Sequence, residues 1–431
     1  MFIKLIVLAI TLISLCFEFY EMKLIDAKRK EPLPAEVADI YSPERYQTFL
    51  NYKSDYRKVA LLKSAVSLIM TMMIFLTPLF HIIESISRHT VYSVFFLTAA
   101  LIIVLNALIT FVFDYYSTFT IEEKYGKNKK TLAIFIKDEL LDLVLEVAFT
   151  AIIMIPLIYL FEHIDGWTHH FTFTYGQSFL MTLAIFAGIM MIYLILLGIS
   201  YIAIHVQYEF TDLEEGDLRN KIVALMADSK KKVKLIKVYN ESKKSTSKNA
   251  FLLKVLWHRE FGIADNFLSE NAEDELLAVL SHEVGHLKHK KNIHNYIRYL
   301  MPVCLFALIV YLIPNGQIII NMNNAVKTAF SLTITNYYLL FLIVSTLLEP
   351  IMFLFSLYSN FATRIEEYEA DYNAVKEGYG EALIRTFKQL SNDELIDVNP
   401  PDLIEFIEFD HPGMYHRIKA IREAEAKLAQ S

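Results

Sequence analysis

The chain has 431 residues, of which 55% are hydrophobic and 21% charged, and its mean hydropathy is +0.36. This apolar content indicates a membrane protein rather than the two or three soluble domains that the length alone would allow. The net charge of −7 gives no sign of nucleic-acid binding, and the two isolated cysteines, Cys16 and Cys304, exclude a disulfide framework or a thiolate zinc site.

Seven apolar runs are long enough to cross a bilayer as helices, for which about 20 residues suffice. They cover residues 2–19, 62–83, 91–113, 143–161, 179–204, 299–319 and 337–358. A signal peptide is the alternative for the first run, but residues 17–21 offer no small-residue cleavage site. We therefore predict seven spans.

The loops between these runs alternate between rich and poor in lysine and arginine. The segments after the first, third and fifth runs are basic. The loop after the second run has only Arg88, the loop after the fourth has no lysine or arginine, and the loop after the sixth has only Lys327. The positive-inside rule then places segments 206–298 and 359–431 in the cytosol and the N-terminus on the opposite side of the membrane.

The two cytosolic segments contain the remaining predicted elements. The alternation in residues 233–239 predicts a strand, and the apolar stretch 250–257 is a candidate partner strand beyond a polar turn. A helix is expected from about Glu273 onward, continuing into the sixth span. The tail 359–431 is predicted to be helical, with breaks at its prolines.

The expected helix contains His282-Glu283-Val284-Gly285-His286, which has the spacing of a zinc site. Residues four apart lie on one helical face, so both imidazoles can reach one metal ion. The glutamate between them projects beside the metal, where it can hold a water molecule. A chance match in a helix rich in histidine and lysine is the alternative, because two histidines alone leave a zinc site incomplete.

The seventh run leads directly into a helix whose carboxylates complete such a site. Glu367 and Asp371 are one turn apart on one face. One of them can bind the metal, while the other accepts the ring N–H of a ligand histidine. Glu366 lies on a different face and Glu369 is less well spaced. A solvated acidic patch is the alternative, which the histidine motif on the same predicted side of the membrane disfavours.

These stretches resemble the integral-membrane zinc metalloproteases called CAAX prenyl protease 1, the family that includes the a-factor-converting endopeptidase. The likeness runs from about Tyr41 to Arg417, with the same number of spans. It is carried by residues 116–126 (YSTFTIEEKYG), 247–251 (SKNAF), 277–286 (LAVLSHEVGH), 364–371 (RIEEYEAD) and 411–417 (HPGMYHR). Lys291 is a departure, since it stands where the family commonly has a later histidine.

The resemblance implies a role for each matching position. His282, His286 and Glu367 would bind one zinc ion per chain, and Glu283 would be the general base. The further implied roles are Asp371 as partner of a ligand histidine, preferably His282; His411 for the oxyanion or the substrate; Arg417 and Arg364 for bracing the site; and Asn249, Ala250 and Phe251 for pairing with the substrate backbone.

The resemblance also implies an all-α multi-pass membrane protein. About seven helices would surround a water-filled chamber, with a small α+β gluzincin-type protease domain on the cytosolic side. We divide the chain into a membrane domain (residues 1–205), a catalytic segment (206–298), the sixth and seventh spans (299–358) and a C-terminal catalytic segment (359–431). Glu349 is costly to bury in lipid and is expected to face the chamber; a local kink at Pro350 is the structural alternative.

The function implied is that of a membrane-embedded zinc endopeptidase that cuts near the C-terminus of prenylated, CaaX-type proteins. Two alternatives stay open: a bacterial-type quality-control metalloprotease, and a transporter or channel with a structural metal, which Glu283 disfavours because a structural site needs no base. Expected partners are the lipid bilayer and a peptide or prenylated protein. The membrane would be the plasma membrane of a bacterium or the endoplasmic reticulum of a eukaryote, and the oligomeric state is left open.

Overall fold

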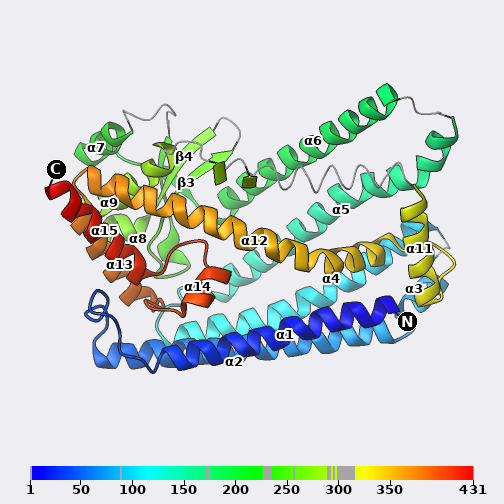
Figure 1. Cartoon of the computed structure of the whole chain (residues 1–431), viewed down its shortest axis with the longest axis horizontal. Coiled ribbons are helices and arrows are strands. Elements are labelled where there is room, and N and C mark those ends of the chain that lie inside the picture. Colours follow the sequence, from blue (N-terminus) through cyan, green and yellow to red (C-terminus); the bar gives the residue numbers. More distant parts are fainter. Residues whose placement is uncertain are drawn as a thin grey trace.

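The computed structural model describes residues 2–87, 90–170, 175–226, 235–255, 258–288, 293–294, 297–298 and 316–430. Long helices run along the long axis of the molecule, and a small sheet with short helices lies at one end (Figure 1). The C-terminus lies at the end that holds the sheet, and the N-terminus lies at the opposite end. The chain is thus a bundle of long helices with an α+β region at one end.

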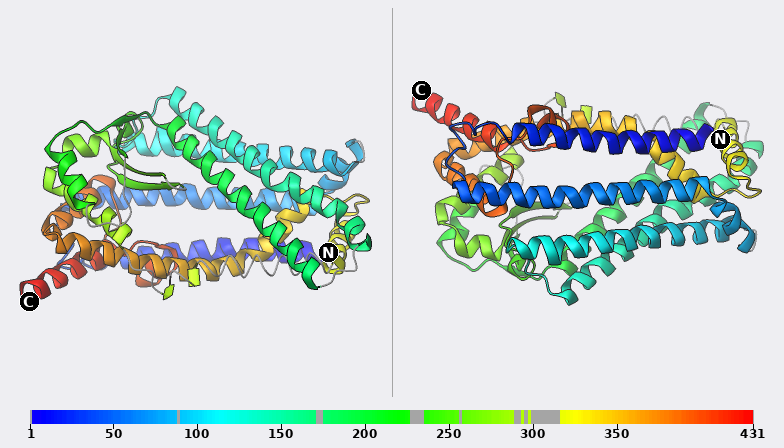
Figure 2. Two further views of the ribbon diagram at one scale, coloured as in Figure 1. Left: turned by 90° about the horizontal axis from the view of Figure 1, so that it is seen from above. Right: turned by 90° about the horizontal axis from the view of Figure 1, so that it is seen from below.

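The long helices follow from the apolar runs. They are α1 (Phe2–Lys28), α2 (Pro43–Leu76), α4 (Val91–Tyr116), α5 (Leu132–His170), α6 (Tyr175–Gln207) and α12 (Tyr337–Lys376), with the short α3 (Leu79–Ile86) and α11 (Gly316–Phe330) at the far end. A π-helical segment, η1 (Ser117–Glu122), continues α4. Seen from above and below, α1, α2, α4 and α12 lie beside one another with their axes roughly along the long axis of the molecule (Figure 2).

Five of the seven predicted spans have helices of sufficient length and hydropathy among the described residues. These helices are α1, α2, α4 with η1, the portion of α5 up to Tyr159, and α12. The fifth predicted run lies within α6, where Tyr193–Gln207 forms a shorter apolar helix. The sixth predicted run, 299–319, falls almost wholly outside the described residues. The second run, 62–83, is not one helix as expected: α2 ends at Leu76, because Pro78 cannot continue it, and α3 begins at Leu79.

The sheet has four strands in the order β1-β2-β4-β3. They are β1 (Phe210–Asp212), β2 (Leu235–Tyr239), β3 (Ala250–Val255) and β4 (His258–Ala264). The pairing predicted between the two sequence-identified strands is wrong: β2 pairs in parallel with β4, and β3 pairs antiparallel with β4. Because only two residues separate β3 from β4, the local hairpin forms in preference to a pairing of β3 with β2. As a result β3 lies at the edge of the sheet.

Short helices surround the sheet and the ends of the long helices. They are α7 (Asp217–Leu225), η2 (Glu241–Lys243), α8 (Asp265–Glu270), α9 (Glu273–Lys288), α13 (Gly380–Glu394), α14 (Asp402–Glu408) and α15 (Met414–Ala429). Helix α9 buries Leu276, Leu280 and Val284, which recur every four residues, in one core with Phe261 of β4. The tail is helical with breaks near its prolines, as predicted. The expected continuation of α9 beyond Lys288 falls largely outside the described residues.

Candidate metal centre

Helices α9 and α12 pack against each other and carry the predicted site. Gly285 of α9 lies directly on α12, since a Cβ built at this position would come within 2.8 Å of Ala370 Cα. On the same contact, Asn373 donates a hydrogen bond from Nδ2 to the main-chain oxygen of Ser281 at 2.8 Å. The missing side chain of Gly285 therefore lets the two helices approach closely enough for their polar side chains to meet.

His282, His286 and Glu367 come together across this contact. The Nε2 atoms of the two histidines are 3.2 Å apart. Glu367 places Oε1 3.2 Å from Nε2 of His286 and Oε2 3.4 Å from Nε2 of His282. In the described portion of the chain, this is the one group of three His, Cys, Asp or Glu side chains whose ligand atoms converge, all within 4.8 Å of one another. We call these three residues the metal-site cluster.

The metal-site cluster fits a tetrahedral metal ion. Zinc bonds of about 2.0–2.1 Å at tetrahedral angles place neighbouring ligand atoms about 3.3 Å apart. The two Nε2 atoms are 3.2 Å apart, and they lie 3.2 and 3.4 Å from different oxygens of Glu367. Taken with one ligand atom from each residue, the cluster lies within 4.8 Å. Within the described structure, Oε2 of Glu367 is buried without a hydrogen bond of standard geometry, although Nε2 of His282 and Nη2 of Arg417 lie 3.4 and 3.5 Å away. A buried carboxylate oxygen in that position is costly unless a cation binds it, so the donor set suits a metal.

Asp371 and Arg417 lie behind the metal-site cluster. Oδ1 of Asp371 is 2.9 Å from Nδ1 of His282. Arg417 donates to both oxygens of Asp371, from Nε at 2.9 Å and from Nη2 at 2.6 Å, and its guanidinium stacks on the ring of Phe387 at 4.1 Å. A carboxylate at Nδ1 fixes the orientation of the ring, so Nε2 of His282 is directed at the centre of the cluster.

This environment raises the pKa of His282 to about 9. Burial alone would lower that pKa, but the contacts with the carboxylates of Asp371 and Glu367 outweigh the burial. In the absence of a metal, His282 is therefore protonated at neutral pH. A metal ion must displace this proton in order to bind, so metal affinity falls as the pH falls.

His411 reaches the cluster from the loop between α14 and α15. Its Nε2 is 3.4 Å from Oε1 of Glu367, and its Nδ1 is 2.8 Å from Oδ1 of Asp410. The side chain is 56% exposed, in contrast to the buried Glu367. His411 thus borders the cluster on a side that solvent can reach.

Glu405, which the sequence analysis missed, holds the loop of His411 in place. It is only 7% exposed and accepts the main-chain N–H of Gly413 at 2.9 Å. Nδ1 of His416 lies 2.9 Å from its other oxygen. A Cβ at Gly413 would come within 2.7 Å of Oε2 of Glu405, so a larger residue there would displace that carboxylate.

Arg364 ties the same loop to α12. Its guanidinium donates to the main-chain oxygens of Glu405, at 3.1 Å, and of Phe409. These carbonyls belong to the end of α14, where helical partners are missing and a cation is favoured. Sequence reasoning had no local signal for Glu405, because α14 carries acidic residues at several positions and only the fold brings one of them to Gly413 and His416.

The predicted substrate-binding residues lie at the free edge of the sheet. Ala250 and Phe251 begin the edge strand β3, and Asn249 precedes it with its main-chain oxygen bonded to the N–H of Ala264 at 2.9 Å. The ring of Phe251 fits against Gly262 of β4, where a Cβ would come within 2.6 Å of it. Helix α9 packs against this strand, so the edge and the zinc-motif helix belong to one unit.

Several polar residues of α9, α12 and the segment between them lie outside the metal-site cluster. Glu366 forms an ion pair with Arg298 at 3.2 Å, and Glu369 is exposed on the outer face of α12. Nδ1 of His294 is 3.1 Å from the hydroxyl of Tyr358. Glu283 is half-buried on α9 between the two histidines. His289 and Lys291 fall outside the described residues.

Comparisons with known families match nearly the whole chain. Residues 21–197 match the model of the CAAX prenyl protease N-terminal region, described as five membrane helices, and residues 212–425 match that of peptidase family M48. The chain is 28% identical to the probable CAAX prenyl protease 1 of Schizosaccharomyces pombe, over 91% of this chain and 82% of that protein. It is 26% identical to the CAAX prenyl protease 1 of Saccharomyces cerevisiae, over 79% of this chain and 74% of that protein.

The fold is also that of a solved structure. The crystal structure of S. mikatae Ste24p superposes with a TM-score of 0.74 at 22% sequence identity, covering 97% of this chain and 98% of that one. The multi-pass helical architecture with its small sheet is therefore a known one.

Proposed function

The chain belongs to peptidase family M48, in the group of the CAAX prenyl protease 1 proteins, and is a membrane-embedded metalloendopeptidase; we propose that it holds one zinc ion on His282, His286 and Glu367. The convergence of the two imidazoles and the Glu367 carboxylate, with ligand atoms within 4.8 Å of one another, is the observation that supports this assignment most directly. Membership of a peptidase family removes the alternative of a transporter or channel.

Glu283 is proposed as the general base. It lies between the two histidines on the helix that presents them, where a bound zinc ion would supply a Lewis acid. From this position its carboxylate accepts a proton from the attacking water and passes it to the departing amine. Asp371 and Arg417 are positioning residues, because they contact His282 and Glu367 rather than the peptide.

His411 is proposed to contact the substrate. Its ring borders the cluster on the exposed side, where the carbonyl oxygen of the scissile bond would lie, and a hydrogen bond to the oxyanion there lowers the barrier. The free edge of β3 offers main-chain donors and acceptors to an extended peptide beside α9. Asn249, Ala250 and Phe251 begin that edge.

The proposed substrate is the C-terminal region of a prenylated protein or peptide, in line with the names of the relatives. A lipid-bearing peptide needs a site that apolar helices border. Helix α12, which carries Glu367, is one of the membrane-crossing helices. Polar side chains within the membrane-crossing helices support the proposed water-filled chamber. Lys63 of α2 and Asp142 and Glu146 of α5 line one cavity of about 340 Å³, and such residues face wet interiors rather than lipid.

We also propose the chain division given above and a cytosolic orientation of the catalytic segments. The alternation of basic loops supports that orientation. Single cysteines in place of Lys124 and Ala325 test it, because the two must react with a membrane-impermeant reagent from opposite sides. Labelling from one side would contradict the seven-span arrangement.

One purified sample tests the function. The wild-type protein should contain one zinc per chain and should cleave a farnesylated CaaX peptide faster than the same peptide without the lipid. Glu283→Gln keeps the shape of the side chain but cannot accept a proton. Its turnover should fall by about 10²–10⁴-fold, while its zinc content stays at the wild-type level.

Three outcomes would contradict these proposals. A Glu283→Gln protein with near wild-type turnover refutes the general base. A Glu283→Gln protein that has lost its metal shows that a ligand was taken for a base. Equal cleavage of both peptides favours the quality-control protease over the prenyl-specific enzyme.

A further inference from the structure

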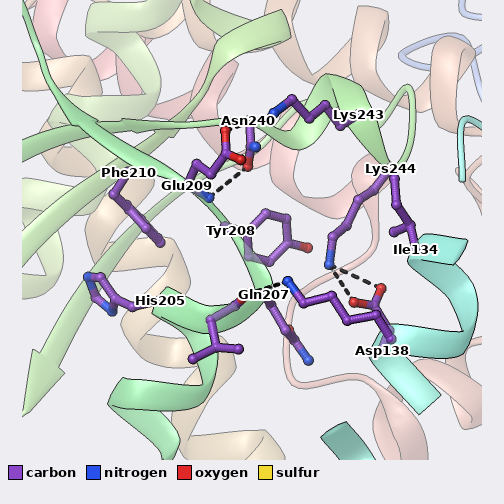
Figure 3. Close-up of a pocket in the computed structure, with 12 residues that line it drawn as sticks. Ile134, Asp138, His205, Gln207, Tyr208, Glu209, Phe210, Asn240, Lys243 and Lys244 are labelled. Carbon is purple, nitrogen blue, oxygen red and sulfur yellow. Dashed lines mark hydrogen bonds and ion pairs between the residues drawn. The ribbon is translucent and has the colours of Figure 1, made fainter. Parts of the chain in front are cut away.

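A second cavity lies where the membrane helices meet the sheet (Figure 3). Its volume is about 640 Å³, and it is lined by the first turns of α5, the end of α6 with the residues that lead into β1, and the loop after β2. It shares no residue with the metal-site cluster. The catalytic chemistry proposed above makes no use of it.

We place this cavity near the membrane surface, because it lies at the ends of two apolar helical stretches. The apolar stretches of the two helices are Leu132–Tyr159 in α5 and Tyr193–Gln207 in α6. The cavity lies where the first begins and the second ends, on the side of the sheet. Tyr208 and Phe210 line it, and aromatic side chains of this kind are typical of the head-group region.

Two lysines share the carboxylate of Asp138, and one of them, Lys244, lines the cavity. Buried Lys244 donates to both oxygens of Asp138, at 2.9 and 3.0 Å, as Figure 3 shows. Nζ of Lys130 lies 3.1 Å from the same carboxylate. The Lys244 ammonium also lies 4.4 Å from the centroid of the Tyr208 ring. One carboxylate thus faces two ammonium groups.

At the rim, Lys243 forms an ion pair with Glu209, and Lys137 also lines the cavity. Nζ of Lys243 is 2.7 Å from Oε2 of Glu209. The pKa of Glu209 is lowered by this hydrogen bond and by the charge of Lys243, and also by the charge of Lys137. Lys137 itself donates to the main-chain oxygen of Val206 at 2.8 Å, in the last turn of α6, where the helix dipole favours a cation.

The residues that line the cavity carry one positive charge in excess, and the nearby acids Glu241 and Glu260 lie outside the lining. Glu241 is buried next to Tyr208 and accepts the hydroxyl of Ser245 at 2.6 Å. Glu260 is buried behind His205, 3.4 Å from its Nε2, and does not line the cavity. Among the residues that line the cavity, Lys137, Lys243 and Lys244 therefore face the carboxylates of Asp138 and Glu209 alone. A phosphodiester, with one negative charge and several acceptor oxygens, complements this balance.

The surface next to the cavity is apolar in the direction of the membrane. Leu140 and Val144 are exposed and follow Lys137 at three and seven residues, so all three lie on one face of α5. Ile202 and Val206 are exposed near the end of α6. A ligand whose phosphate lies beside Lys137 can therefore extend acyl chains along α5 and α6.

We propose that this cavity binds the head group of an anionic phospholipid, with its phosphate between Lys137 and Lys243 and its acyl chains along the exposed faces of α5 and α6. Basic pockets between membrane helices bind anionic lipids in this way. The lipid would join α5, α6 and the sheet at one point, and would so connect the bilayer to the sheet that carries the proposed substrate edge.

Thermal unfolding of the full-length, metal-loaded protein in neutral detergent tests the proposal. The probes are dihexanoyl phosphatidylglycerol, dihexanoyl phosphatidylcholine and inorganic phosphate. Phosphatidylglycerol should raise the unfolding temperature saturably and more than either other probe. In the double variant Lys137→Gln with Lys243→Gln, the half-saturating concentration should rise about tenfold or more, since each basic group near the surface contributes to anionic-lipid binding.

A matched control removes two exposed lysines outside the cavity, through Lys124→Gln with Lys221→Gln, and should respond like the wild type. The proposal is wrong if the Lys137/Lys243 variant also responds like the wild type. It is equally wrong if inorganic phosphate or phosphatidylcholine stabilises the wild type as strongly as phosphatidylglycerol does. These comparisons on the wild type decide the matter even if the double variant is unstable.

Discussion

Glu349 and Glu367 belong to one helix and have opposite surroundings. They are eighteen positions apart on α12, which continues through Pro350. Eighteen positions are five turns, so the two acids project from the same face about 27 Å apart. Glu367 is 3% exposed and lies among two histidines and Arg417. Glu349 is exposed in the membrane-crossing portion. The period of the helix turns both acids to one side, and the elements packed there decide which of them can bind a metal.

The strongest test of this comparison removes the buried acid. Glu367→Ala should lose the metal and reduce peptidase activity to background, because two histidines cannot complete the site. Metal content per chain after dialysis against a chelator measures the first effect. Glu366→Ala is the matched control and should keep both metal and activity, since Glu366 pairs with Arg298 instead. Full metal retention by Glu367→Ala at chelator levels that spare the wild type would show that the third ligand is misassigned.

A second test separates the two helices that meet at Glu367. Gly285→Ala places a methyl group against the main chain of Ala370, where there is no room. Overpacking of this kind costs about 1–3 kcal/mol, so metal affinity should fall by about 5–150-fold. A chelator titration measures it. The control is Gly198→Ala in α6, which has open space around the new methyl group and should bind metal normally. Equal affinities in the two variants would mean that close helix packing does not form the site.

A weaker effect is expected from the ion pair of Glu405 and His416, which we call the clamp on the His411 loop. The hydrogen bond between these two side chains raises the pKa of His416, and burial opposes this rise. The pKa of Glu405 is lowered, because the hydrogen bonds from His416 and Gly413 outweigh burial. The ion pair therefore contributes fully between the ordinary values of about 4.5 and 6.5 and is lost as the pH rises through the raised pKa of His416.

Glu405→Gln keeps the hydrogen bond to Gly413 but not the charge. Because His416 is more than a third exposed, the loss should be under about 1 kcal/mol, or a few-fold in turnover. The alkaline decline of turnover that the clamp causes should move to lower pH, with metal content unchanged. Glu423→Gln, on the exposed face of α15, serves as the control. Superimposable pH profiles of the wild type and Glu405→Gln would show that the clamp does not act on turnover.

The smallest effect is expected from removing the charge of the exposed acid. Glu349→Gln should leave metal content unchanged and alter turnover by less than about twofold, because Glu349 contacts no residue of the metal-site cluster. The same assays measure both quantities. A loss of metal in this variant would mean that Glu349 and the metal-site cluster are coupled along α12, and that the two ends of the helix are not independent.

The sequence by itself determined the kind of structure and the identity of the candidate ligands. Long apolar runs specify spans because lipid leaves the backbone no partner outside a helix. The spacing of His282 and His286, and that of Glu367 and Asp371, specifies which side chains share a helical face. Both features depend only on residues that are close in the sequence, so the period of the helix is enough to predict them.

Only the tertiary structure decided which faces meet. The strand order placed β4 between β2 and β3, because the short β3–β4 connection favours the hairpin. The contact of Gly285 with Ala370 joined two helical faces that are far apart in the sequence. The fold likewise selected Glu405 from the acids of α14 and gathered lysines from α5 and from the loop after β2 around one cavity. These outcomes depend on long-range packing, for which a local pattern of residues carries no signal.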